Sequence, residues 1–349
     1  MKLDPINKAS METIETSAFV IALEDTNPTT PQERMQTFLL GDGSNRWYDK
    51  SITFTVCANG VSGFLNEHSQ IDGATLALLN QPVIYAIRDH KVGALDPSAK
   101  PLSFTPCHFT LSPDLPPILS VARQNFLNTV SNIEFELATV SKLGSAFFAA
   151  HQLNAAHCWE IITQIASRLF FGRQVAAWTA VLMDMYHLGR PDVVGVCTPV
   201  VVSFIDAAIK EIQPGEEEAT KKDLRTQFRR CVRELSSAIQ LGELGQVHDR
   251  TFTAMEWVLR PDEEAPTLFK SDAGYYNSRP RHIMAGQNVG PEAIGEVGFV
   301  LMDPKSVWMT YAIFEHGAEY SIVNAGGNAS RFADCIARAA DIVERFFTD

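Results

Sequence analysis

The pattern that most constrains the fold is a hairpin near the N-terminus. Residues 51–56 read Ser-Ile-Thr-Phe-Thr-Val, which alternates polar and apolar side chains with the period of a half-buried strand. Asn59-Gly60 follows, a dipeptide that tolerates the positive φ angles of a tight hairpin turn. Residues 61–65 are expected to return as the second strand. The hairpin would therefore deliver Glu67-His68 directly at its end.

The rest of the chain is dominated by helical patterns. Apolar residues recur at a spacing near 3.6 in residues 118–141, 154–173 and 174–188, which predicts helices there. Residues 218–241 carry one apolar stripe opposite Arg and Lys, and this stripe consists of Leu224, Phe228, Val232, Leu235 and Ile239.

A final helix is expected to begin near Asn328, a residue type favoured as a helix N-cap. Its predicted buried side chains are Phe332, Ile336, Ile342, Val343 and Phe346.

Strand patterns return late in the chain. Residues 296–302 and 307–314 are rich in β-branched and aromatic types and are separated by a turn at residues 303–306. Strands interspersed with long helices predict an α/β fold with a mixed sheet flanked by helices. The polar residues 24–46 predict a long surface connection.

A proline-rich segment suggests where the chain divides. Residues 96–117 contain Pro97, Pro101, Pro106, Pro113, Pro116 and Pro117. We therefore expect a first part at residues 1–110, which carries the candidate catalytic histidine, and a second part at residues 111–349.

Charge and cysteine usage exclude several classes of function. The net charge is −12, which repels nucleic-acid backbones and anionic membranes, so neither is expected as a partner. No apolar run approaches the roughly 18–20 residues that cross a bilayer. The cysteines and histidines show no metal-ligand spacing, and scattered cysteines among apolar neighbours fit a reducing, cytoplasmic setting.

The pair of His68 and Asp72 is the candidate for chemistry. A histidine after a strand, with a carboxylate four residues later, can act as a general base whose imidazole the carboxylate orients. The spacing alone is common, and a histidine without a catalytic role is the alternative.

Four further motifs carry a resemblance to a family. They are Asn-Arg-Trp-Tyr-Asp-Lys at 45–50, Glu-His-Ser-Gln-Ile-Asp-Gly at 67–73, Met-Tyr-His-Leu-Gly-Arg at 185–190 and Asp-Arg at 249–250. Gly-Pro at 290–291 begins another similar stretch. In this order they resemble the C-terminal portion of the choline/carnitine O-acyltransferase family, in particular the branch associated with fungal polyketide synthases.

The resemblance implies a fold and a mechanism. Members have two chloramphenicol-acetyltransferase-like lobes and place the catalytic histidine beyond the middle of a longer chain. Here 67 residues precede His68, so the first lobe is expected to be largely missing. His68 would take the proton of an acceptor hydroxyl, and Asp72 would orient it. Ser278, or the amide of Asn277, falls near the family's Ser-Thr-Ser element and would stabilise the oxyanion.

The donor segment departs from the family pattern. Members that use coenzyme A carry lysines before the Leu-Ser-Pro-Asp sequence, and residues 144–153 here contain none. A charge-assisted phosphate contact contributes roughly 1.5–3 kcal/mol, so several losses would weaken coenzyme A binding strongly. We therefore expect acyl-phosphopantetheine on an acyl carrier protein as cosubstrate, ahead of acyl-CoA, and no tightly bound cofactor.

The acceptor side is expected at Arg250, Trp178 and Pro191. Trp178 and Pro191 replace a tyrosine and a threonine of the carnitine-using members, while Arg250 matches the family arginine, either as an anion anchor or as an ordinary ion pair. These changes favour a small hydroxyl acceptor, a polyol or hydroxylated metabolite, over carnitine. Two alternatives stay open: a carnitine O-acyltransferase that uses acyl-CoA, and an inactive remnant or carrier-binding module that lacks its N-terminal lobe.

Overall fold

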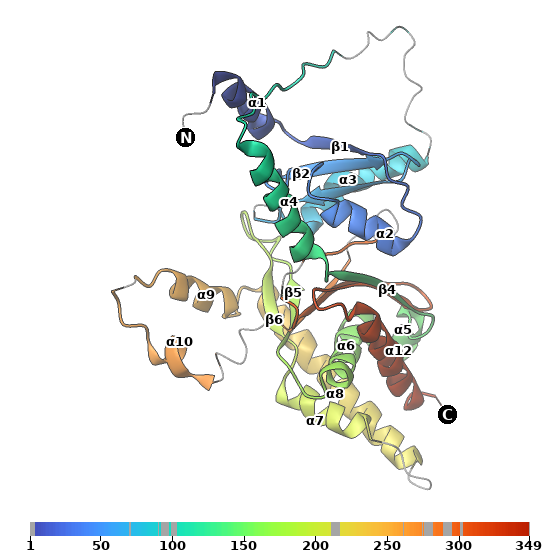
Figure 1. Ribbon diagram of the computed structural model, residues 1–349. Helices are drawn as coiled ribbons and strands as arrows, with labels where there is room; N and C mark the ends of the chain where they lie inside the picture. Colours follow the sequence, from blue (N-terminus) through green and yellow to red (C-terminus); the bar gives the residue numbers. More distant parts are fainter. Residues whose placement is uncertain are drawn as a thin grey trace. The chain divides into compact units, whose positions relative to one another are not determined.

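The computed structural model describes residues 4–69, 71–89, 91, 98, 103–210, 217–260, 262–273, 275, 282–288, 295–300 and 303–348 (Figure 1). The chain divides into two units, Met1–Asn132 with Val289–Glu296, and Ile133–Asn288 with Val297–Asp349. The first division thus falls after Asn132, beyond the proline-rich segment. The assignment of residues 1–110 and 111–349 to two family lobes stays a prediction.

The first unit is built on the expected hairpin. Strands β2 (Ile52–Cys57) and β3 (Ser62–Asn66) are antiparallel, with Thr53 opposite Leu65. Gly60 has φ +82° in the turn, as the Asn-Gly dipeptide predicts. β1 (Val20–Glu24) adds a parallel strand at the free side of β2, giving the order β1-β2-β3.

Two helices of the first unit lie within residues 24–46, where the polar composition predicted a surface connection. The unit contains α1 (Pro5–Thr16), α2 (Pro31–Met35), the π-helix η1 (Gln36–Leu40), α3 (Gly73–Arg88) and α4 (Leu115–Val130). The prediction of a plain connection was wrong because Thr30 and Glu33 form a reciprocal capping box, with proline at the first helical position. These two local signals nucleate α2 inside a polar stretch.

The second unit contains a six-stranded mixed sheet, which confirms the expected fold class. Its strand order is β4-β9-β8-β7-β5-β6, with β7 parallel to both β5 and β8 and the other pairs antiparallel. The strands are β4 (Glu134–Val140), β5 (Ala177–Val181), β6 (Asp192–Gly195), β7 (Ile283–Gln287), β8 (Val307–Ile313) and β9 (Ala318–Asn324).

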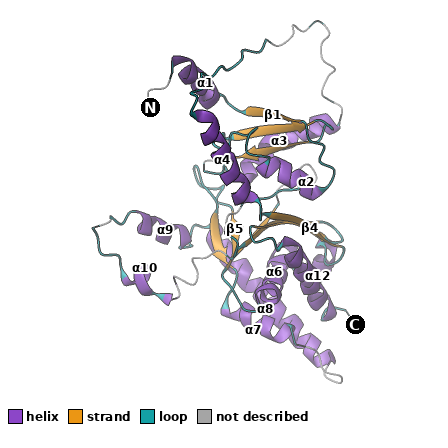
Figure 2. Cartoon of the chain, in the orientation of Figure 1, coloured by secondary structure: helices purple, strands orange, loops and turns teal. Residues whose placement is uncertain are grey.

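The helices of this unit gather mainly on one side of the sheet, as Figure 2 shows for α6, α7, α8 and α12. α6 packs between α12, α8 and the sheet, and its side chains from Cys158 to Ser167 are all buried. The helices are α5 (Ser145–Ala150), α6 (Ala155–Phe171), α7 (Pro199–Ala208), α8 (Glu217–Glu243), α9 (Asp249–Trp257), α10 (Thr267–Ser271) and α12 (Ala329–Arg345).

The predicted amphipathic helices α8 and α12 are confirmed. Leu224, Phe228, Val232 and Leu235 are buried along α8. α12 begins after the expected N-cap, Asn328, and its apolar stripe joins the core of the second unit. Both helices are positioned by burial of one apolar face, which is the free-energy term that the sequence pattern encodes.

Three other predictions were wrong. Residues 134–140 form β4 and residues 177–181 form β5, where helical spacing had been inferred. Short apolar runs fit both periods, and pairing of β4 with β9 decides the outcome because it supplies backbone hydrogen-bond partners. Residues 296–300 are not in a strand, although β8 confirms the second half of that predicted pair.

Among the helices that the structure describes, none combines the length and apolar character needed to cross a bilayer.

Candidate active site

His68 and Asp72 lie close together in the first unit. β3 ends at Asn66, the chain turns through His68, and Asp72 occupies the N-cap position of α3. The imidazole Nδ1 and the carboxylate Oδ1 are 3.6 Å apart, within ion-pair distance for a protonated imidazole. The His68 side chain is 44% exposed and the Asp72 side chain only 12%. The ring is thus accessible to a substrate, whereas the carboxylate is mostly buried.

The two residues that flank His68, Glu67 and Ser69, are hydrogen-bonded to each other. The backbone N–H and the hydroxyl of Ser69 donate to the carboxylate of Glu67 at 2.9 and 2.5 Å. These hydrogen bonds, the hydroxyl first, lower the pKa of Glu67 below its ordinary value. The Ser69 hydroxyl therefore donates locally, as expected for a residue that orders the turn.

The basic residues of the 45–50 motif support the hairpin. The Arg46 guanidinium is fully buried, pairs with Glu24 of β1 at 2.5 Å and donates to the carbonyl of Thr37. Lys50 is buried as well and donates to the carbonyl oxygens of Glu15 and Ser17 at 2.9 and 2.8 Å. The motif thus joins α1, η1 and β1 around the strands that present His68. Sequence reasoning used these residues as a signature and did not assign this supporting role.

The predicted oxyanion donor, Ser278, lies outside the described residues, and so do Asn277 and Gly290-Pro291. Tyr275 of the same segment is described, and its hydroxyl donates to Glu256 at 2.9 Å.

The three predicted acceptor residues all belong to the second unit. Arg250 lies on α9, which packs against β6, and its Nε is 3.8 Å from Oδ1 of Asp192. Pro191 directly precedes Asp192, so it and Arg250 come to the same end of β6. Trp178 of β5 pairs with Gly195, at the other end of β6. With about 3.3 Å per strand residue, the β5–β6 pair separates Trp178 from Asp192 by roughly 10 Å.

The segment predicted to face the donor forms α5 and the turn after it. Gly144 must stay a glycine, because a Cβ atom there would lie 2.3 Å from the carbonyl oxygen of Glu315. The carbonyl of His151 accepts a hydrogen bond from Arg229 of α8 at 2.8 Å. Burial, and then the charges of Arg229 and Arg225, lower the pKa of His151. The positive charge beside this segment therefore comes from α8 and not from lysines of its own.

Glu160 is a buried titratable residue that the sequence analysis missed. One carboxylate oxygen accepts hydrogen bonds from the hydroxyls of Tyr311 and Thr179, both at 2.8 Å. Burial raises the pKa of Glu160 to about 7, although these hydrogen bonds oppose the shift. Its signal in the sequence was a single carboxylate between Trp159 and Ile161 in an apolar helix. Thr179 and Tyr311 come from β5 and β8, the two strands that flank β7.

Within the described ranges, no three side chains of His, Cys, Asp or Glu are grouped closely enough to share a metal ion. Chemically, an exposed imidazole with a carboxylate 3.6 Å away is an arrangement that can transfer a proton.

Comparison with known proteins identifies the family of this chain. The family model described as "Choline/Carnitine o-acyltransferase" matches residues 1–338. The chain therefore belongs to the choline/carnitine O-acyltransferase family, and the resemblance inferred from its motifs is confirmed.

Two relatives illustrate the two branches. The chain is 31% identical to the highly reducing polyketide synthase ltbA of Aspergillus luteorubrus, over 99% of this chain and 11% of that protein. It is 26% identical to the mitochondrial carnitine O-acetyltransferase of Saccharomyces cerevisiae, over 97% of this chain and 51% of that enzyme. The chain thus spans about a tenth of the first relative and half of the second.

Among solved structures, the epimerization domain from the third module of tyrocidine synthetase B is similar over 95% of this chain and 81% of that one. The sequence identity is 11% and the TM-score 0.43.

Proposed function

We propose that this chain carries the catalytic base of an O-acyltransferase, which transfers an acyl group from a thioester to a hydroxyl. The observation that carries the proposal is the His68–Asp72 pair, with Nδ1 and Oδ1 3.6 Å apart at the end of the hairpin. Membership of the family supports the reaction class.

The orientation of the pair suggests how the proton moves. With Nδ1–H directed at Asp72, the lone pair on Nε2 is left to accept the proton of an acceptor hydroxyl. The hydroxyl oxygen attacks the thioester carbonyl, forming the C–O bond and a tetrahedral oxyanion, for which Ser278 is the proposed donor. When the C–S bond breaks, the imidazolium returns the proton to the leaving thiolate. Asp72 stabilises the imidazolium between the two transfers.

An acyl carrier protein is the proposed donor. The α5 segment lacks the lysines that would hold the phosphates of coenzyme A, whereas a carrier-bound phosphopantetheine thioester has no nucleotide to hold. Relatives named as highly reducing polyketide synthases support the same choice.

A small hydroxyl compound without a carboxylate is the proposed acceptor. Arg250 is 3.8 Å from Asp192, so an anionic acceptor would compete with a carboxylate already beside the guanidinium. Trp178 and Pro191 offer no hydroxyl groups to such an anion.

Two alternatives to this proposal stay open. The match to carnitine O-acetyltransferase, together with Arg250, favours carnitine and acyl-CoA as substrates. A non-catalytic remnant or a carrier-binding module is the alternative of another class.

The test is acyl transfer from an acylated carrier protein, from acyl-CoA and from acyl-pantetheine, with a panel of polyols and carnitine as acceptors. We expect turnover from the carrier and a loss of roughly 10²–10⁴-fold in His68→Ala. His316→Ala is the matched control, because His316 is a surface histidine outside the site. Equal turnover in wild type and His68→Ala would refute the role of His68. Turnover from acyl-CoA and carnitine alone would establish a carnitine O-acyltransferase that uses acyl-CoA.

A further inference from the structure

A cluster of positive charge on α8 contrasts with the rest of this acidic chain. Residues 221–233 contain Lys221, Lys222, Arg225, Arg229, Arg230 and Arg233, and one carboxylate, Asp223. The whole chain has a net charge of −12. This local excess of positive charge is not needed for solubility, because the acidic side chains already provide a solvated surface.

Three of these cations bind backbone carbonyls of neighbouring segments. Lys221 and Arg225 donate to the carbonyls of Thr348 and Phe346, just beyond α12, at 3.0 and 2.9 Å. Arg229 donates to the carbonyl of His151, at the end of the donor segment. These contacts suit cations at the C-termini of helices, and they also direct one edge of α8 toward α5.

The other three cations, Lys222, Arg230 and Arg233, are exposed. Residues 8 and 11 positions apart return to the same side of an α-helix, so these side chains share the outward face. Within the part of the chain that the structure describes, no carboxylate lies within 4.0 Å of them. We call these three residues, together with Arg229 at the edge, the basic face of α8; Arg225 beside them is paired with Glu218 at 2.7 Å.

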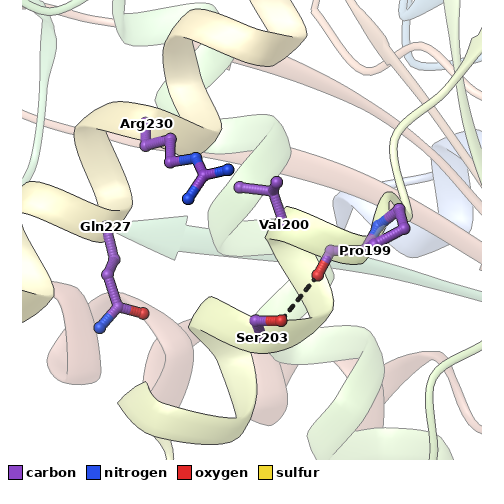
Figure 3. A pocket seen from close by; sticks show the side chains of 5 residues that line it. All are labelled: Pro199, Val200, Ser203, Gln227 and Arg230. Atoms are coloured by element: carbon purple, nitrogen blue, oxygen red, sulfur yellow. Dashed lines mark hydrogen bonds between the residues drawn. The ribbon is translucent and has the colours of Figure 1, made fainter.

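A pocket adjoins the basic face where α8 meets α7. It has a volume of about 260 Å³ and is lined by Pro199, Val200, Ser203, Gln227 and Arg230 (Figure 3). Ser203 donates to the carbonyl of Pro199, so its hydroxyl hydrogen is engaged. Pro199 and Val200 supply apolar contact, and Arg230 supplies a positive charge at the same opening. Such a lining fits one side chain of a partner, with an apolar stem and a negative end.

We propose that the basic face of α8 is the docking surface for an acidic face of the carrier protein that brings the acyl group. The choice of partner rests on the proposed function, because it takes a carrier-bound thioester as donor. The choice of surface rests on charge complementarity. A chain of net charge −12 repels an acidic partner, except at the basic face of α8, where the local charge is positive. Arg229 also joins the patch directly to the donor segment, through His151.

The experiment is a binding titration of the chain with a phosphopantetheine-bearing carrier protein, at low and at physiological salt. The variant Lys222→Glu/Arg230→Glu/Arg233→Glu removes the positive face without touching residues of the proposed active site. The matched control is Arg173→Glu/Lys305→Glu/Arg338→Glu, which makes the same charge change at exposed cations elsewhere in the second unit. A further variant, Ser203→Trp, fills the pocket and leaves the charge unchanged.

We expect the first triple variant to raise the Kd for the carrier protein by tenfold or more at low salt, with the control within twofold of wild type. Wild-type affinity should fall as salt rises, and the triple variant should lose that dependence. Ser203→Trp should weaken binding at both salt concentrations.

An unchanged Kd in the first triple variant, equal losses in both triple variants, or no measurable binding by wild type would each overturn the proposal. Turnover of acyl-pantetheine, a thioester with no carrier protein, reports on the proposed function separately. Its absence would count against the acyltransferase assignment, while the titration would still decide the docking surface.

Discussion

Asp72 lies 3.6 Å from the His68 imidazole, and in the proposed mechanism it orients that ring. The Asp72 side chain is mostly buried, whereas the His68 side chain is exposed. We expect Asp72→Asn to lower kcat by roughly 10²-fold or more, because an amide cannot stabilise the imidazolium as a carboxylate does. Steady-state kinetics should show this loss in kcat, with the KM of the acceptor little changed. A loss confined to KM would mean that Asp72 binds the acceptor instead.

The buried carboxyl group of Glu160 makes the stability of the second unit depend on pH. Burial raises its pKa from 4.5 to about 7 in the folded state. The folded state therefore binds the proton more tightly than the unfolded state, so its contribution to stability is present below pH 4.5 and is lost as pH rises through about 7. The difference corresponds to about 3 kcal/mol.

We expect the free energy of unfolding of the second unit to fall between about pH 4.5 and pH 7, and Glu160→Gln to flatten that dependence. Urea unfolding monitored at several pH values measures both. Glu319→Gln, a substitution on β9 outside the buried cluster, is the control. A pH profile that is identical in wild type and Glu160→Gln would contradict the assignment.

At the scale of elements, the capping box holds α2 in place. The Thr30 hydroxyl accepts from the backbone of Glu33, and the Glu33 carboxylate accepts from the backbone of Thr29 and Thr30. These backbone bonds lower the pKa of Glu33 to about 2. Thr30→Ala should reduce stability by about 1 kcal/mol and raise the hydrogen-exchange rates of residues 31–40. Thr13→Ala, which removes a hydroxyl from the middle of α1, should leave those rates unchanged.

Several helices and strands could be predicted from the periodicity of the sequence, and others could not. The hairpin of β2 and β3, and helices α6, α8 and α12, agree with their predictions, because each buries a face whose period is visible in the sequence. β4 and β5 were mistaken for helices. Their apolar side chains, such as Phe135 and Val181, fit both periods, and only the neighbouring strands decide between them.

At the scale of the whole chain, the first unit presents an apolar sheet face. Ile21 and Leu23 of β1 are 58% and 73% exposed, and Phe19 and Val56 are exposed beside them. β1 is also an edge strand in the described sheet. An exposed apolar face beside an open edge favours association.

We expect the isolated chain to associate in a concentration-dependent manner, and Ile21→Lys/Leu23→Lys to raise its monomer fraction. Light scattering coupled to size-exclusion chromatography measures this. Leu188→Lys is the control, since Leu188 is highly exposed but lies in the second unit. A wild-type chain that stays monomeric at high concentration would contradict the prediction that this apolar face drives association.

The sequence by itself determined the family, the α/β class and the His68–Asp72 pair. These depend on local spacing: a hairpin ends at a known residue, and a carboxylate four positions later comes back within ion-pair distance. Tertiary structure alone decided that Glu160 is buried between Thr179 and Tyr311, that Arg46 and Lys50 support the hairpin, and that the cations of α8 adjoin the α5 segment. Each of these features joins residues far apart in the chain, and their burial, pairing and charge arise only once packing brings them together.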